Sequence, residues 1–196
     1  MNSIKLLTLF ILSGFHSCAQ QGYNSTAKQF TDSAFKIFKT TGDPTKALPL
    51  LDQALNIDSN YVPALSSKFS FEMASKMLDK ALLTGQSLIR IKPNVGEYYS
   101  ALGIIYEQKQ DSISSRKCFI IAIACYDKKL DTMSKENRNY DAILLNKAFN
   151  LILVGQQKYG NDILKQLFDE SSDENYKEII KSFMNKTKQQ ILADMK

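Results

Sequence analysis

The feature that most constrains the fold is a pattern of small and large residues that recurs every 34 positions. Ala47, Ala81 and Ser115 share one small-residue position, and Leu51 and Phe119 share the large-residue position four residues later. Three positions on, the first and third segments have a further small residue, Ala54 and Ala122, and the second has Leu88. These positions have the three-and-four spacing of one helix face. A single register across three segments without a gap predicts a chain built by stacking one supersecondary unit.

A 34-residue period resembles that of the tetratricopeptide repeat, which is a pair of antiparallel helices. The third segment carries the resemblance best, because YYSALGIIYEQKQ supplies both aromatic positions and the Leu-Gly pair of the repeat's first helix. The second segment fits least well, since Glu72 and Gly85 stand where the repeat has large apolar residues. A fourth segment follows an insertion of about eleven residues, with Gly155 at its turn and Gly160 and Leu164 in its second helix.

This resemblance implies an all-α fold, an α-α superhelix (tetratricopeptide solenoid) of about four helix pairs over residues 29–170. Residues 171–196 are expected to form a C-terminal capping helix that runs from about 173 to 194. Ser171 and Glu174 have the spacing of a capping box, and an apolar stripe at helical spacing follows. Such a helix would close the end of the array.

Residues 1–17 have the form of a signal peptide. One cation, Lys5, precedes LLTLFILSGF, an apolar run shorter than the roughly 20 residues that span a bilayer as a helix. The following Ser17–Cys18 pair resembles the lipobox of bacterial lipoproteins, although Phe15 and His16 depart from that pattern. The resemblance implies that Cys18 becomes the first mature residue and carries lipid. The alternative is an ordinary secretory signal peptide and a secreted periplasmic protein without lipid.

Residues 18–28 are small and polar, which predicts a flexible tether between the lipid and the folded region. Cleavage before Cys18 would remove His16, the only histidine of the chain. Catalysis by a histidine base and metal binding by histidine would then be impossible in the mature protein. We therefore predict no catalytic residue, no metal site and no cofactor.

The two remaining cysteines, Cys118 and Cys125, lie seven positions apart in one expected helix. Their Cα atoms would be roughly 10 Å apart, whereas a disulfide requires less than about 7 Å. We expect both to be buried as small apolar residues.

The formal net charge is +5, and the basic residues are interspersed with acidic ones. The chain has no run of lysine and arginine interleaved with aromatic residues. Nucleic acid is therefore not an expected partner. Tetratricopeptide arrays bind peptides or protein segments in a concave groove. The resemblance implies a non-enzymatic interaction or scaffold module, lipid-anchored in the bacterial cell envelope and facing the periplasm. Its partner would be another envelope protein or peptide, and its contact with the membrane would be the N-terminal lipid. The alternative from another class is an envelope glycan hydrolase that uses carboxylates only, which needs two facing acids.

In the family, the first helix of each pair lines the groove, and this defines the groove face here. It comprises Gln29, Asp32, Lys36 and Lys39 in the first repeat, Ser66, Ser70 and Met73 in the second, and Ser100, Ile104, Glu107 and Gln108 in the third. In addition to the apolar stripe with which it packs against its partner helix, the first helix of the fourth repeat carries a second apolar stripe on the groove face. We expect the C-terminal helix, through Phe183, or a partner to cover this stripe, which consists of Leu145, Phe149, Ile152 and Leu153.

Overall fold

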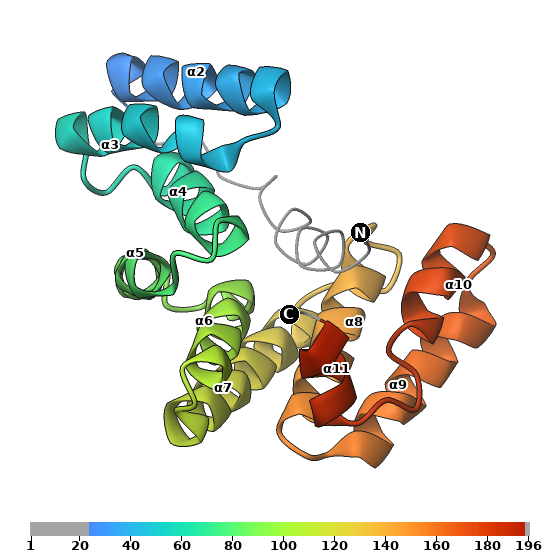
Figure 1. Ribbon diagram of the computed structural model, residues 1–196. Helices are drawn as coiled ribbons and strands as arrows, with labels where there is room; N and C mark the ends of the chain where they lie inside the picture. Colours follow the sequence, from blue (N-terminus) through green and yellow to red (C-terminus); the bar gives the residue numbers. More distant parts are fainter. Residues whose placement is uncertain (1–23, 195–196) are drawn as a thin grey trace. The chain divides into compact units, whose positions relative to one another are not determined.

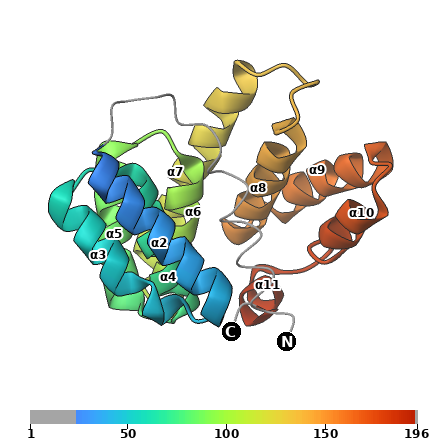
Figure 2. The ribbon, with the colours of Figure 1, turned by 90° about the horizontal axis from the view of Figure 1, so that it is seen from above.

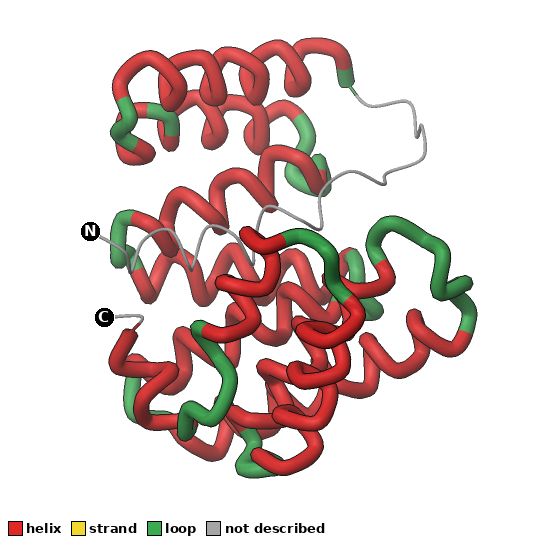
Figure 3. The backbone as a smooth tube through the Cα atoms, turned by 90° about the vertical axis from the view of Figure 1, so that its right-hand side faces the viewer, coloured by secondary structure: helices red, strands yellow, loops and turns green. Residues whose placement is uncertain are grey.

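The structure is a computed structural model that describes residues 24–194. These residues form α-helices joined by short loops and one 3-10 turn, without a strand in that range (Figure 3). The all-α class expected from the sequence is confirmed for this part of the chain. The expected signal peptide and Cys18 lie outside the described residues. The chain divides into two compact units at Pro93 and Asn94.

The first unit contains two helix hairpins (Figure 1). Its elements are α2 (Ser25–Thr41), η1 (Pro44–Lys46), α3 (Leu48–Ile57), α4 (Val62–Ala74) and α5 (Leu78–Ile91). Helix α2 packs against α3, and α4 packs against both α3 and α5. A cluster of buried alanine, leucine and aromatic side chains fills the space among α2, α3 and α4.

The second unit contains two further hairpins and a C-terminal extension (Figure 2). Its elements are α6 (Gly96–Gln108), α7 (Ser112–Asp131), α8 (Tyr140–Leu153), α9 (Gln157–Glu170), α10 (Glu174–Lys181) and α11 (Lys188–Asp194). Helix α6 packs against α7, α7 against α8, and α9 against both α8 and α10. The chain thus turns back after each long helix, as a repeat of helix pairs requires.

The small-residue positions read from the sequence lie where the helices of a hairpin approach each other. Ala54 and Ala122 are fully buried, as expected. Gly103 on α6 shows how little room is available, because a Cβ atom there would lie 2.4 Å from a ring carbon of Phe119 on α7. Gly160 on α9 is similar, since its Cβ would lie 2.7 Å from the carbonyl oxygen of Ala148 on α8.

The turn inside each hairpin repeats as closely as the buried positions do. Gly42, Lys76 and Gln110 have positive φ angles of 67°, 55° and 62° and are spaced 34 residues apart. Gly155 holds the corresponding turn of the fourth hairpin with φ of 88°. After the last three of these residues, the next amide donates to the carbonyl five residues earlier, at 2.8–2.9 Å. This is the hydrogen bond that closes a helix C-terminus around a left-handed residue. The 34-residue period is therefore a property of the backbone as well as of the side chains.

Two boundaries differ from the expectation. The first helix begins at Ser25 rather than Gln29, because the Asn24 side chain accepts hydrogen bonds from the amides of Thr26 and Ala27 and caps the helix there. The last four residues of the expected tether are thus helical.

The expected single C-terminal helix is broken in two. It stops at Lys181, and Asn185 adopts a left-handed φ of 61°. A new helix then starts after Thr187, whose hydroxyl accepts from the Gln190 amide while the Gln190 side chain accepts from the Thr187 amide. This reciprocal pair is a capping box.

The insertion between the third and fourth repeats is used partly to lengthen α7. Tyr126 and Ala122 form a cluster with Ile143 of α8, and Leu130 and Met133 pack against it. Helix α7 therefore continues as far as Asp131. Among residues 24–194, no helix has both the length and the apolar character needed to span a membrane.

Candidate functional site

The residues expected on the groove face differ greatly in accessibility. Exposed are Gln29, Asp32, Lys36, Lys39 and Gln108; partly buried are Ser70 and Glu107; buried are Ser66, Met73, Ser100 and Ile104. A buried side chain cannot contact a partner without rearrangement. The accessible part of the expected face is therefore α2 in the first unit and the end of α6 in the second.

On α2 the expected residues share one solvent-facing side of the helix. Asp32 is engaged by Lys28 one turn earlier, with Lys28 Nζ 2.6 Å from its carboxylate. Lys36 and Lys39 continue the same side toward the C-terminus of the helix and are exposed. Phe35, which is also exposed, lies edge-on to the ring of Phe71 on α4, with ring centroids 6.0 Å apart. The surface is basic with an aromatic margin, and such a surface suits an acidic segment of a partner.

Glu72, which departs from the repeat pattern, is only 1% exposed. Its carboxylate accepts a 2.7 Å hydrogen bond from the Thr84 hydroxyl on α5. Lys68 lies 3.9 Å from the same carboxylate and 2.5 Å from that of Asp52 on α3. Burial raises the pKa of Glu72, while Thr84 and Lys68 act in the opposite direction.

The Glu72 network joins α3, α4 and α5 and explains how a polar residue occupies a position where the sequence resemblance predicts an apolar one. A carboxyl group that acts on a glycan must contact it, and Glu72 is covered. We therefore assign Glu72 to helix packing.

A second buried polar contact joins the third and fourth hairpins inside the second unit. The Asn150 side chain of α8 donates to the Ser100 hydroxyl of α6 at 3.0 Å and to the Asn146 carbonyl at 2.8 Å. Arg116 of α7 also donates to the carbonyl of Val154, at the end of α8, at 2.7 Å. These bonds hold α8 against the third hairpin, formed by α6 and α7. Ser100 therefore takes part in helix packing inside the unit.

The apolar stripe of the fourth repeat is buried in the structure. Leu145, Phe149, Ile152 and Leu153 are all at most 7% exposed. Phe183, which follows α10, is 1% exposed and lies edge-on to Phe149, with ring centroids 5.5 Å apart. The C-terminal segment thus contacts the stripe, through the residue that the sequence singled out.

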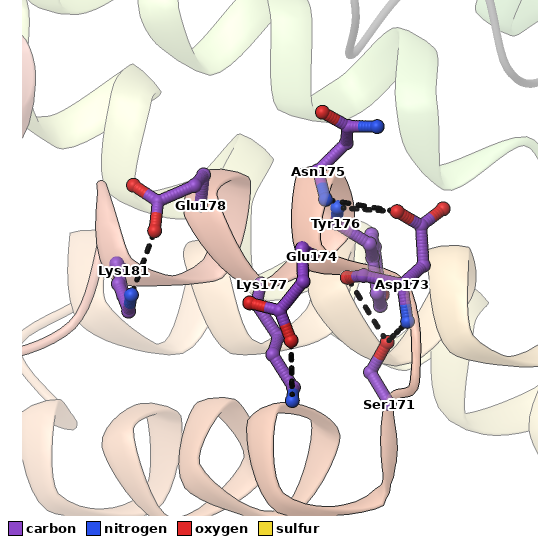
Figure 4. A network of polar contacts seen from close by, with 8 residues as sticks. All are labelled: Ser171, Asp173, Glu174, Asn175, Tyr176, Lys177, Glu178 and Lys181. Carbon is purple, nitrogen blue, oxygen red and sulfur yellow. Dashed lines mark hydrogen bonds and ion pairs between the residues drawn. The ribbon is translucent and has the colours of Figure 1, made fainter.

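Figure 4 shows the polar contacts that cap helix α10 and pair charged residues along it. Asp173, rather than Ser171, caps it by accepting from the amides of Asn175 and Tyr176, while the Ser171 hydroxyl accepts from the Asp173 amide. The Tyr176 hydroxyl donates to the Asp141 carbonyl at the start of α8 at 3.1 Å. This bond ties the C-terminal extension to the fourth hairpin.

The sequence did not indicate the role of α11. Its Lys188 Nζ lies 2.6 Å from the carboxylate of Glu107, a groove-face residue 81 positions earlier. Ile191, one turn further, is 1% exposed. The Thr187–Gln190 spacing was the available signal for a separate helix, whereas no local pattern pairs Lys188 with Glu107.

The cysteines Cys118 and Cys125 are both thiols and are partly buried on α7. Burial raises the pKa of Cys118 to about 11 and also raises that of Cys125. Neither residue is therefore an activated nucleophile. In the described part of the chain, no three histidine, cysteine, aspartate or glutamate side chains lie together so that they could hold a metal ion.

No protein-family model matches the chain, and no curated protein sequence matches it.

Proposed function

We propose that this chain is a lipid-anchored, tetratricopeptide-like interaction module of the bacterial cell envelope. It would bind a peptide or protein segment on the concave side of a helical array and would have no catalytic role. The observation that carries the proposal is the recurrence of left-handed hairpin turns at 34-residue spacing, in register with buried small residues. Stacked helix pairs of this kind present long surfaces suited to binding other chains.

The expected location follows from the N-terminal sequence. The short apolar run that ends in Ser17–Cys18 supports lipid attachment at Cys18. One acyl chain alone gives marginal membrane binding, so stable anchoring requires the several chains that bacterial lipoproteins carry. The test is incorporation of labelled palmitate in cells that produce the wild type or Cys18→Ser. Equal labelling of the two proteins would refute the anchoring part of the proposal.

The binding surface in the first unit is the exposed side of α2. Lys36 and Lys39 provide positive charge there, and oppositely charged partners are drawn to such a surface before they dock. The experiment is cross-linking and capture from detergent-solubilised envelopes, followed by mass spectrometry. We expect Lys36→Glu/Lys39→Glu to lose the partners that the wild type captures.

The matched control is Lys158→Glu/Lys165→Glu on α9, which changes the net charge equally at exposed positions. It should capture the same partners as the wild type. If the α2 variant captured them as well, another face of the helices would have to be the binding surface. Equal loss in both variants would show that only net charge matters.

A further inference from the structure

Helix α11 occupies part of the groove face of the second unit. Among the expected groove residues of α6, Glu107 lies at the end of the helix and is paired with Lys188. The Lys188 and Glu107 side chains are 28% and 14% exposed, so the ion pair is largely shielded from water. Ile191 lies one helical turn after Lys188 and is buried. The helix thus places one cation and one aliphatic side chain against the unit.

The loop before α11 has contacts of its own with the unit. The Asn185 amide donates to the Asn161 side chain at 2.9 Å, and the Gln157 side chain donates to the Lys186 carbonyl at 2.6 Å. Both partners belong to α9, and Phe183 is seated against Phe149 just before this loop. These contacts hold the chain up to Lys186 and define a fixed point from which α11 starts.

Helix α11 has only seven residues. A helix this short does not persist in water without tertiary contacts, so its own stability contributes little. Its capping box and the 2.7 Å ion pair between Lys186 and Asp194 are internal to the segment and do not attach it to the rest of the unit. Two features attach α11 to the rest of the unit: the ion pair between Lys188 and Glu107, and the burial of Ile191.

We propose that α11 is a latch that covers the Glu107 end of the groove face, and that a partner segment of matching chemistry replaces it. The matching segment is a short helix with a lysine or arginine near its N-terminus and an aliphatic residue three positions later. These groups take the places of Lys188 and Ile191. The inference rests on the proposed binding function and specifies the partner for the second unit.

The competition between latch and partner is unequal in the intact protein. Because the loop that precedes α11 is hydrogen-bonded to α9, the effective concentration of α11 at Glu107 is on the order of millimolar or higher. A partner therefore binds with an apparent dissociation constant equal to its intrinsic value divided by the fraction of molecules in which α11 is released. Release of the latch should strengthen binding without any change at Glu107.

The experiment uses the whole mature chain and a synthetic peptide of residues 186–196 as the probe. Hydrogen exchange measures opening of α11, and an NMR titration into the millimolar range measures peptide binding. In Lys188→Glu, a like charge faces Glu107, so we expect faster exchange in α11 and about tenfold tighter binding of the peptide than in the wild type. The control Lys165→Glu, at an exposed position on α9, should leave both unchanged.

A charge exchange separates occupancy from general loosening. The double variant Glu107→Lys/Lys188→Glu should regain slow exchange in α11. Glu107→Lys alone should bind a peptide that carries Lys188→Glu in preference to the unmodified peptide. If Lys188→Glu fails to fold, Lys188→Gln keeps much of the stem without a like charge and should show the same effects in smaller measure.

Three outcomes would overturn the proposal. The first is unchanged exchange of α11 in both Lys188 variants. The second is a released α11 with no gain in peptide binding. The third is a concentration-dependent dimer of the released variant in sedimentation, because a second copy would then be the occupant. None of them involves Lys36 or Lys39 in the first unit, so the capture test of the binding function stands independently.

Discussion

Replacement of Gly103 by alanine tests whether the hairpins depend on close helix approach. The added Cβ would lie 2.4, 2.6 and 2.9 Å from three ring carbons of Phe119, and real Cβ contacts are not that short. Phe119 is fully buried, so movement of its ring would displace other buried groups. Overpacking of this kind costs about 1–3 kcal/mol, with this site near the upper end. Alanine regains about 1 kcal/mol through helix propensity, which leaves a net loss of about 1–2 kcal/mol.

The assay is thermal and urea unfolding followed by circular dichroism. For a chain of this length, the net loss corresponds to a decrease in Tm of about 3–6 °C. The control is the second substitution Phe119→Leu, which removes ring atoms near position 103. Because the two residues touch, the double variant should be more stable than the sum of the single changes predicts, by about 1 kcal/mol.

Two results would refute this reasoning. If Gly103→Ala were as stable as the wild type, the helices would not be held at the distance that the structure shows. If the losses were additive, the cost of the alanine would not come from the Phe119 ring.

Four further predictions concern separate sites. Cys118, with its pKa raised by burial to about 11, should react with iodoacetamide at pH 8 about a hundredfold more slowly in the folded protein than in urea. Burial raises the folded-state pKa of Glu72, so stability should fall as pH rises from the ordinary glutamate pKa through the raised value, and Glu72→Gln should remove that slope in urea unfolding. Gln110→Gly relieves a left-handed φ of 62° and should raise Tm by about 2 °C. Phe183→Ala should cost about 3 kcal/mol in urea unfolding because the ring is buried against Phe149; full stability of that variant would show that the segment after α10 is not part of the core.

The hairpins could be predicted from the sequence because close helix packing restricts residue type at few positions. Ala47, Ala54 and Ala122 are all fully buried, and each falls at a position that the 34-residue register marks as small. Glu72 shows the limit of that reasoning. Its type contradicts an apolar position, and its burial becomes understandable only once Thr84 and Lys68 are seen beside it.

The candidate site was less predictable, because accessibility depends on which faces of two helices meet. Ser100 was expected to face a groove, yet it is buried beside Asn150, a residue 50 positions away. The break before α11 depends on the left-handed Asn185 and its contact with Asn161. Contacts between residues so distant in the chain leave no local periodicity, and pattern analysis therefore cannot find them.

The left-handed turns have a consequence for how such a chain diverges. Each compact unit contains one hairpin whose turn residue is glycine and one whose turn residue is not, namely Lys76 or Gln110. A non-glycine residue in this conformation costs roughly 1–2 kcal/mol, which lowers stability without preventing the turn. The residue type at such a turn can therefore change as long as the buried helix contacts offset the loss of stability. Backbone periodicity can in this way outlast the residue identities by which repeats are usually matched.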